Sequence, residues 1–215
     1  MPSREYHESL WEQVPPGVAP VHAQAREEFL LDAIATMRAS TTDAVRVLDV
    51  GCGDGHFAAV AQRAGAEVVA LDVAEEPLRR ARALCAGLDA RLVDSEAEWP
   101  LQDSSFELVW AGETIEHVAD TASWLSEVRR VLRSHGMLLL STPDNGPLSM
   151  LRLVLRPRTF DTHFDPRSDH LRFYTRRTLV ALLEDFGFEN VAVRTVGGPP
   201  WAQRSLLASA SRRRF

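Results

Sequence analysis

The sequence predicts a single doubly wound α/β domain, that is, a parallel sheet with helices on both faces. Three observations predict it. Short apolar, β-branched segments alternate with helical segments along the chain, as is typical of this fold class. The strand-like segments are apolar throughout, as expected when both faces of a sheet are covered. The length of 215 residues fits one domain with a substantial core.

The individual elements follow from apolar spacing and from the residues that end each segment. Apolar residues at three- and four-residue spacing predict the first helix, over residues 21–39. Glycines after the helical segments, and glycine or aspartate after several strands, mark later boundaries. The expected elements after this helix are strand 45–50, helix 56–64, strand 67–71, helix 75–86, strands 90–93 and 106–110, helix 121–132, strand 137–141, helix 175–186, strand 188–196 and a short strand 205–209.

The basic residues restrict the chemistry and the partners of the protein. All 24 are arginines, so the chain has no lysine for a Schiff base or for a P-loop phosphate site. The net charge of −6 is the sum of −12 over residues 1–151 (12 Arg, 24 acidic) and +6 over residues 152–215 (12 Arg, 6 acidic). Nucleic-acid-binding proteins usually carry a basic domain, so we expect no nucleic acid as a partner.

The cysteine content and the absence of long apolar segments bear on the cellular compartment of the protein. Its two cysteines, Cys52 and Cys85, are too few for a disulfide framework, which favours a reducing compartment. The N-terminal residues carry charges where a signal peptide needs an apolar run, and no segment has the ~18 uninterrupted apolar residues of a membrane span. We therefore expect a cytoplasmic protein without a membrane span. The sequence does not indicate an oligomeric state.

A glycine-rich loop follows the first expected strand. Residues 49–55 read Asp-Val-Gly-Cys-Gly-Asp-Gly, and ligands of doubly wound sheets bind at such loops, beyond the carboxyl ends of the strands. The spacing G-x-G-x-G differs from the G-x-G-x-x-G of dinucleotide sites. Asp49 and Asp54 bracket the glycines and would repel a pyrophosphate, but they suit a ligand with cationic groups. A tight turn without a ligand is the alternative interpretation.

Acidic residues also end the next two expected strands. Asp72 stands where an acid can accept hydrogen bonds from both hydroxyls of a ribose. The pair Asp94-Ser95 could accept a hydrogen bond from an exocyclic amine. A nucleoside with a cationic substituent fits all three positions.

At these residues the sequence resembles a known family, the class I S-adenosylmethionine-dependent methyltransferases, in particular small members of the type 11 group. The resemblance covers roughly residues 45–187. It rests on LDVGCGDG (48–55), VVALDV (68–73), the Asp94-Ser95 pair, FELVWAGETIEHVAD (106–120) and EVRRVLRSHGMLLLSTP (127–143). The combination is much more specific than the glycines alone.

The resemblance implies a Rossmann-like, mostly parallel sheet of about seven strands whose last strand, at 205–209, is antiparallel. It implies S-adenosyl-L-methionine as the cofactor and S-adenosyl-L-homocysteine as the product. Gly51 and Gly53 would bracket the methionine part, Asp72 would bind the ribose, and Val73 would pack on the adenine. The remaining implied cofactor-binding residues are Asp94 or Ser95 at the adenine amine, Ala111 near the methyl donor, Cys52 as a small packing residue of the loop, and Arg26 as a candidate partner of the cofactor's carboxylate.

His117 is the candidate general base, and Glu113 its candidate partner. Methyl transfer to oxygen usually requires removal of the acceptor's proton, whereas a neutral amine does not lose a proton first. If residues 113–117 turn helically, Glu113 and His117 share one face, and Glu113 can orient the imidazole. The alternative is that Glu116 and His117 only brace the loop or contact the cofactor. We expect methylation at oxygen rather than nitrogen, and this rests only on His117.

The long segment 143–174 is the expected wall of the acceptor site. His163, Phe164, His170 and Tyr174 are its candidate substrate-binding residues. Seven arginines between positions 152 and 177 could bind an acidic or aromatic acceptor, or could lie on the surface. The histidines and aspartates of 163–170 match no tight zinc spacing, so we expect no metal.

The single domain 1–215 is thereby divided into a lid and helix (1–40), a cofactor-binding core (45–142), a substrate cap (143–174) and a C-terminal helix with strands (175–215). The segment 6–11 is either a lid over the cofactor or a frayed end. The preferred acceptor is a small molecule. The alternatives are a macromolecular acceptor, a protein that binds the cofactor without catalysis and, against the glycine spacing, a nicotinamide-dependent dehydrogenase.

Overall fold

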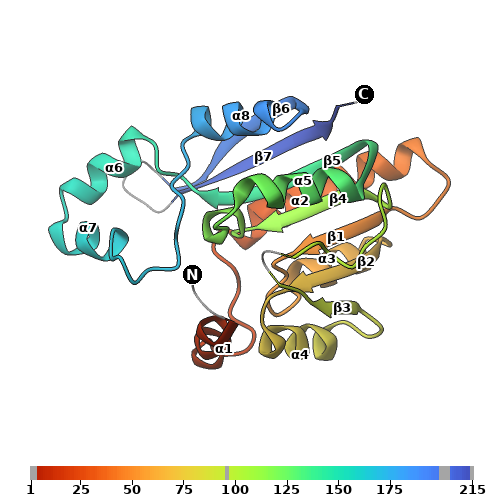
Figure 1. The fold of residues 1–215 in the computed structure, drawn as a ribbon, viewed down its shortest axis with the longest axis horizontal. Helices are drawn as coiled ribbons and strands as arrows, with labels where there is room; N and C mark the ends of the chain where they lie inside the picture. Colours follow the sequence, from red (N-terminus) through yellow and green to blue (C-terminus); the bar gives the residue numbers. More distant parts are fainter. Residues whose placement is uncertain (1–3, 95–96, 199–203, 214–215) are drawn as a thin grey trace.

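The computed structural model describes residues 4–94, 97–198 and 204–213 (Figure 1). Within these residues it has a seven-stranded sheet of order β3-β2-β1-β4-β5-β7-β6, and only β7 runs antiparallel to its neighbours. The predicted fold class, including the antiparallel last strand, is confirmed. The strands are β1 (Arg46–Val50), β2 (Glu67–Asp72), β3 (Asp89–Leu92), β4 (Phe106–Gly112), β5 (Leu132–Pro143), β6 (Phe188–Gly197) and β7 (Arg204–Arg212).

Helices cover both faces of the sheet because the buried strands send alternate side chains to opposite sides. In β1, Val47 packs in a core with helices α2, α3 and α4, whereas Leu48 packs in a second core with α5 and α8. The helices are α1 (Arg4–Gln13), α2 (Ala23–Ser40), α3 (His56–Arg63), α4 (Glu75–Leu84), α5 (Thr121–Val131), α6 (Pro147–Val154), α7 (Pro157–His163), α8 (Arg176–Asp185) and the short 3₁₀ helix η1 (Ile115–His117).

The parallel register places the carboxyl ends of the central strands at one edge of the sheet. Val50 of β1 pairs with Leu71 of β2, and Asp72 pairs with Leu92 of β3. On the other side of β1, Asp49 pairs with Trp110 of β4. The loops that follow β1, β2, β3 and β4 therefore meet at this edge, where the sequence predicts the ligand.

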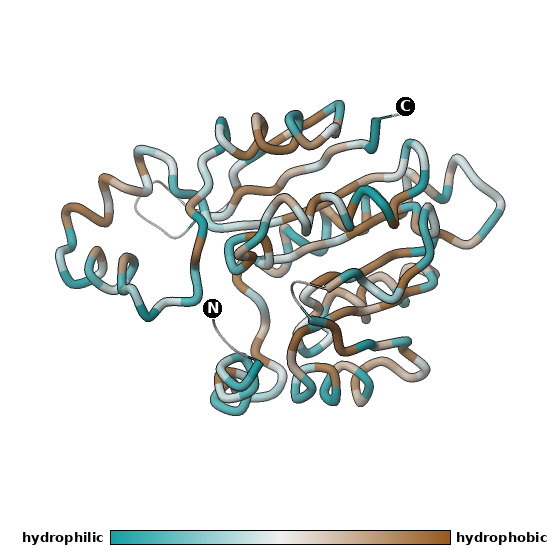
Figure 2. The backbone as a smooth tube through the Cα atoms, in the orientation of Figure 1, coloured by the Kyte–Doolittle hydropathy of each residue, from teal (hydrophilic) through white to brown (hydrophobic). Residues whose placement is uncertain are grey.

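The structure differs from the expected elements mainly at the ends of the chain and in the long insertion. Residues 4–13 form helix α1, which lies beside α4 (Figure 1). The strands expected at 137–141 and 205–209 are longer, because β5 and β7 pair with each other from Met137–Ser211 to Pro143–Ser205. The insertion contains two short helices, α6 and α7, which project from the sheet and show both hydrophilic and hydrophobic stretches (Figure 2). None of the helices in the described part of the chain has the length and apolarity to cross a bilayer.

Candidate functional site

A cavity of about 720 Å³ opens at the carboxyl edge of the sheet. Its volume falls within the range of about 300–1,000 Å³ that is typical of small-ligand sites. Its walls come from the loops after β1 to β4, from helix α1 and from the end of the insertion. Its lining residues include Trp11, Gly51, Gly53, Asp72, Val73, Asp94, Trp99, Glu113, Thr114, His117, Trp124, Asp169 and Leu171.

The glycine loop approaches its neighbours too closely for side chains at two positions. Gly51 and Gly53 both have positive φ, +68° and +53°, and both line the cavity. A Cβ at Gly51 would lie 2.5 Å from Oγ1 of Thr114, and a Cβ at Gly53 would lie 2.8 Å from the ring of Trp11. The backbone N–H of Gly51 donates to the carbonyl of Leu71 at 2.8 Å, which ties the loop to β2. The loop therefore presents backbone to the cavity.

Asp72 shapes the same loop from the end of β2. One carboxylate oxygen accepts from the N–H of Gly53 at 2.9 Å, and the other accepts from the N–H of Ala74 at 3.1 Å. Burial raises the pKa of Asp72, and these backbone N–H groups offset part of the rise. Val73 and Asp94 line the cavity beside it, whereas Ser95 lies outside the described residues.

Three of the implied cofactor-binding residues lie behind the cavity wall rather than on it. Cys52 is buried in the core with α2 and α3, and Ala111 is buried in the core on the opposite face. Arg26 is 2% exposed, and its guanidinium stacks on Phe57 with 4.6 Å from Cζ to the ring centroid. None of the three is a lining residue of the cavity.

A buried carboxyl group, Asp49, lies with Arg26 beneath the glycine loop. Burial raises the pKa of Asp49 to about 7, and the charge of Asp72 adds to the rise, while Arg26 opposes it. Burial also lowers the pKa of Arg26, although nearby carboxylates, Glu113 first, favour its charge. The floor of the cavity is therefore rich in carboxyl groups, with a single buried arginine below them in the described structure.

His117 lines the cavity, but its partner is not the expected one. Glu113 has φ +54°, and only residues 115–117 form the 3₁₀ helix, so the expected shared helical face does not form. The carboxylate of Glu113 accepts instead from Oγ of Ser141 at 2.8 Å. Nδ1 of His117 lies 3.1 Å from the backbone oxygen and 3.3 Å from Oδ2 of Asp169. Asp169, distant in sequence, therefore has the orienting position that we assigned to Glu113.

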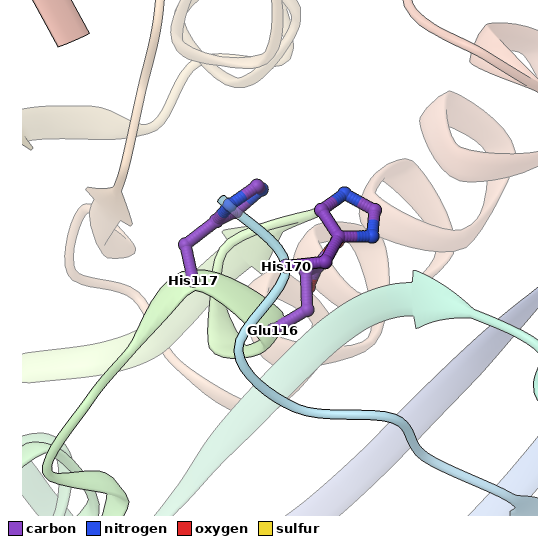
Figure 3. A group of neighbouring side chains, drawn as sticks. All are labelled: Glu116, His117 and His170. Carbon is purple, nitrogen blue, oxygen red and sulfur yellow. The ribbon is translucent and has the colours of Figure 1, made fainter. Parts of the chain in front are cut away.

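The electrostatic surroundings of His117 favour the neutral imidazole. Burial lowers its pKa, and the charge of His170 acts in the same direction, whereas Asp169 raises it. His170 packs edge-on against His117, with ring centroids 4.8 Å apart. Beside them lies Glu116, a buried carboxyl group that the sequence singled out only as a possible brace (Figure 3).

The candidate substrate-binding residues do not gather at the large cavity. His163 and His170 line a separate cavity of about 110 Å³ next to Asn145, to which Nε2 of His163 is hydrogen-bonded at 3.0 Å. Phe164 is exposed and packs against neighbouring rings of α7 and Phe173. Tyr174 is buried in the core. Of the four, only His170 is close to the cavity wall, through His117.

Most described arginines between positions 152 and 177 are exposed to solvent. Arg156 and Arg158 of the insertion and Arg176 and Arg177 at the start of α8 are exposed, and Arg167 pairs with Asp165 at 2.6 Å. Among the described residues of this segment, no arginine lines either cavity. The geometry therefore favours the surface interpretation of this basic stretch.

Helix α1 closes the cavity from one side. Arg80 of α4 donates to the carbonyls of Trp11 and Val14, at 2.9 and 2.7 Å. The carboxylate of Glu8 accepts from the N–H groups of Glu75 and Glu76 at the start of α4. A carboxylate at a helix N-terminus is stabilised by the unpaired N–H groups there. Contacts with α4 therefore hold α1 in place.

Sequence reasoning missed several lining residues. Thr114, Trp99, Trp124 and Leu171 line the cavity. Thr114 lies within the motif at residues 106–120, but the sequence argument assigned roles there to Ala111, Glu113 and His117 and not to Thr114. The others reach the cavity through tertiary packing, which residue spacing does not reveal.

Comparisons with known proteins agree with this geometry. A family model described as a methyltransferase domain matches residues 22–193. A ubiquinone biosynthesis O-methyltransferase from Ruegeria sp. (strain TM1040) is 34% identical over 152 residues, which cover 68% of this chain and 61% of that protein. A malonyl-acyl-carrier-protein O-methyltransferase from Methylococcus capsulatus is 34% identical over 179 residues, 81% of this chain and 62% of that protein. The chain thus spans less than two thirds of the length of these relatives.

The fold is also similar to solved structures. A phosphoethanolamine N-methyltransferase from Haemonchus contortus, in complex with phosphomonomethylethanolamine and S-adenosylhomocysteine, has a TM-score of 0.64 and 15% identity. The similarity covers 90% of this chain and 57% of that one. At this level of identity the similarity shows the fold alone.

Proposed function

This chain belongs to the S-adenosylmethionine-dependent methyltransferases, and we propose from that premise that it transfers the cofactor's methyl group in line to an oxygen of a small-molecule acceptor. One observation carries the proposal. A single cavity joins the glycine loop and Asp72 on one side to His117 and Asp169 on the other.

The first side of the cavity suits the cofactor. Gly51 and Gly53 present backbone to the cavity, where the methionine part would lie, and the carboxylate of Asp72, which lines the same cavity, would accept from the ribose hydroxyls. Val73 and Asp94 flank the position proposed for the adenine. Arg26, Cys52 and Ala111 would then support this wall from behind rather than contact the ligand.

The reaction requires alignment and protection from water more than covalent catalysis. The S–C bond of the sulfonium breaks as the acceptor's oxygen bonds to the methyl carbon, and the positive charge on sulfur disappears. Helix α1 and the rings of Trp99 and Trp124 would exclude water during this step. The acceptor's proton must also leave, and His117 is the candidate through which it does so, with Asp169 orienting the imidazole.

The acceptor would enter between residues 113–119 and the segment 169–171, which form the part of the cavity wall that contains His117. We propose that residues 1–40 act as a lid and helix, 45–142 as the cofactor-binding core, 143–174 as the acceptor cap and 175–215 as the C-terminal support. Of the residues assigned to the acceptor, His170 has the strongest support because it contacts His117. An oxygen acceptor agrees with the names of the two curated relatives.

The test combines cofactor binding with turnover. Calorimetry should show binding of S-adenosylmethionine at one site per chain and no comparable binding of NAD. Release of S-adenosylhomocysteine would then be measured with a panel of phenols, catechols, sugars and amines. Hydroxyl acceptors should support turnover and amines should not. Failure to bind the cofactor would refute the proposal.

Two alternatives predict different results in the same assays. A protein that binds the cofactor without catalysis would show tight binding and no product with any acceptor class. A methyltransferase acting on a macromolecule would be inactive on the panel but would label a protein or RNA fraction with radioactive methyl groups. The cavity volume of about 720 Å³ is that of a small-ligand site, which supports a small acceptor over a macromolecular one.

A further inference from the structure

Three side chains with metal-binding atoms lie together behind the part of the cavity wall that contains His117. Glu116 and His117 come from η1, and His170 comes from the segment that crosses it (Figure 3). One potential ligand atom from each lies within 4.8 Å of the others. Ligand atoms at about 2.1 Å from an ion in tetrahedral geometry are about 3.4 Å apart, so side-chain adjustments of about 1 Å would bring all three into contact with one ion.

Glu116 provides an independent indication of a ligand. Its side chain is 1% exposed, and neither carboxylate oxygen has a hydrogen-bond partner among the described residues. A carboxyl group without a partner is costly to bury, because water no longer solvates it. A bound cation would give this carboxylate a partner.

The hydrogen bonds of His117 suit a metal ligand. Its Nδ1 faces the backbone oxygen and the carboxylate of Asp169, so an N–H at Nδ1 leaves Nε2 with a free lone pair. Histidines that bind metals commonly donate the second ring N–H to a carboxylate or a carbonyl, which fixes the tautomer and the ring orientation. Asp169 would therefore be a positioning residue of the site.

Backbone hydrogen bonds hold η1 next to the segment that contains His170. The carbonyl of Glu116 accepts from the N–H groups of Leu171 and Arg172, at 2.8 and 3.0 Å. The guanidinium of Arg172 also donates to the carbonyl of Ala119 at 2.6 Å. His170 is thus fixed beside Glu116 and His117 without an ion, although they are 53 positions apart or more in the sequence.

We propose that Glu116, His117 and His170 bind one divalent transition-metal ion at the wall between the two cavities. Two imidazoles and one carboxylate are typical ligands of zinc, iron(II) and related ions, whereas magnesium and calcium prefer oxygen ligands alone. This inference rests on the proposed function, which it deepens, and it replaces our expectation from the sequence that no metal binds.

The ion would act on the acceptor. Coordination of the acceptor's hydroxyl lowers the pKa of that hydroxyl, and its proton leaves to solvent. The oxygen then bonds to the methyl carbon as the C–S bond breaks, and S-adenosylhomocysteine departs. In this scheme His117 is a ligand of the ion. The ion promotes loss of the acceptor's proton, and His117 does not have to accept that proton itself.

The test uses the full chain, first treated with a chelator, and Co²⁺ as the probe. Calorimetry should show one Co²⁺ per chain, and the melting temperature should rise with Co²⁺ concentration. Glu116→Gln should weaken binding at least about 100-fold, and Asp169→Asn about 10–100-fold. His135→Ala removes an exposed histidine remote from the group and should bind Co²⁺ like the unchanged protein.

Glu116→Gln separates a metal site from a merely structural carboxyl group. Its amide has nearly the same shape and, like a protonated carboxyl group, carries no charge, so the metal-free variant should be about as stable as the unchanged protein. The variant should nevertheless lose the Co²⁺-dependent rise in melting temperature. Absence of saturable binding at one ion per chain, or equal binding by the variant, would overturn the inference.

Cofactor binding and turnover distinguish this inference from the proposed function. If the chelated protein still binds S-adenosylmethionine and methylates an acceptor at the full rate, the metal inference fails and the proposed function stands. If Co²⁺ binds as described but neither cofactor binding nor turnover is found, the proposed function fails, and the metal site remains as a binding site only. Restoration of turnover by Co²⁺ or Zn²⁺ would support both.

Discussion

Gly51→Ala tests whether close packing of the glycine loop requires glycine at this position. The new Cβ would lie 2.5 Å from Oγ1 and 2.8 Å from Cγ2 of Thr114, in a backbone with φ +68°. The strain of a left-handed residue costs about 1–2 kcal/mol, and reduced freedom of the unfolded chain returns about 0.4–1 kcal/mol. Overpacking adds about 1–3 kcal/mol. We expect a total loss of about 2–4 kcal/mol in the free energy of unfolding.

Gly87→Ala is a matched control for the backbone strain. Gly87 has φ +74°, and a Cβ there would meet nothing within 4 Å. Its substitution should therefore cost only about 1 kcal/mol. Both variants would be measured by urea unfolding, with the slope of the transition checked to be unchanged.

Thr114→Ala completes the test as a double-mutant cycle. Alone, it removes the hydrogen bond from Oγ1 of Thr114 to the carbonyl of Val50 and should cost about 1 kcal/mol. In this background the closest remaining contact of the new Cβ at position 51 is 3.3 Å, so the cost of Gly51→Ala should fall to nearly that of Gly87→Ala. An equal cost of Gly51→Ala in both backgrounds would refute the packing argument.

Further predictions concern the lid, the buried acid and the proton step. Arg80→Ala should release α1 and so speed the dissociation of S-adenosylmethionine, measured by stopped flow. Arg79→Ala is the control, because Arg79 is hydrogen-bonded to Glu76 and not to α1 in the described structure. Equal dissociation rates in the two variants would exclude a lid held by Arg80. Because the folded-state pKa of Asp49 is raised to about 7, the folded protein keeps a proton that the unfolded chain loses. Stability measured by urea unfolding should therefore fall as the pH rises from about 4 to 7, by at most about 4 kcal/mol, and level off above 7. Asp49→Asn should flatten this dependence, and an unchanged profile would assign it to other groups. His117→Ala should leave the calorimetric affinity for S-adenosylmethionine within a few-fold and lower turnover about 10²–10⁴-fold; unchanged turnover would remove His117 from the reaction.

The sequence was sufficient for the fold and for the cofactor side of the cavity. Parallel strands bring their carboxyl ends to one edge, so residues that follow consecutive strands can be placed together without coordinates. Gly51, Gly53, Asp72 and Asp94 line the cavity for this reason. Their contacts with a cofactor remain a prediction.

The acceptor side could not be predicted in the same way because long-range contacts build it. Helical spacing suggested that Glu113 faces His117, but the positive φ of Glu113 turns its side chain to Ser141. Asp169 and His170 reach His117 only because their segment hydrogen-bonds to the backbone of η1. Pairing between a loop and a distant segment leaves no periodic pattern in the sequence.

The position of β7 has a consequence for the order of events during synthesis. β7 lies between β5 and β6, and its side chains Leu206 and Leu207 are fully buried. About 60 residues separate the end of β5 at Pro143 from the start of β7 at Arg204, which corresponds to about 3–12 s at roughly 5–20 residues per second. During this interval β5 presents an unpaired, apolar edge, and β6 emerges from the ribosome before the strand that joins it to the sheet. The nascent chain is therefore most exposed to edge-to-edge association just before its last strand is made.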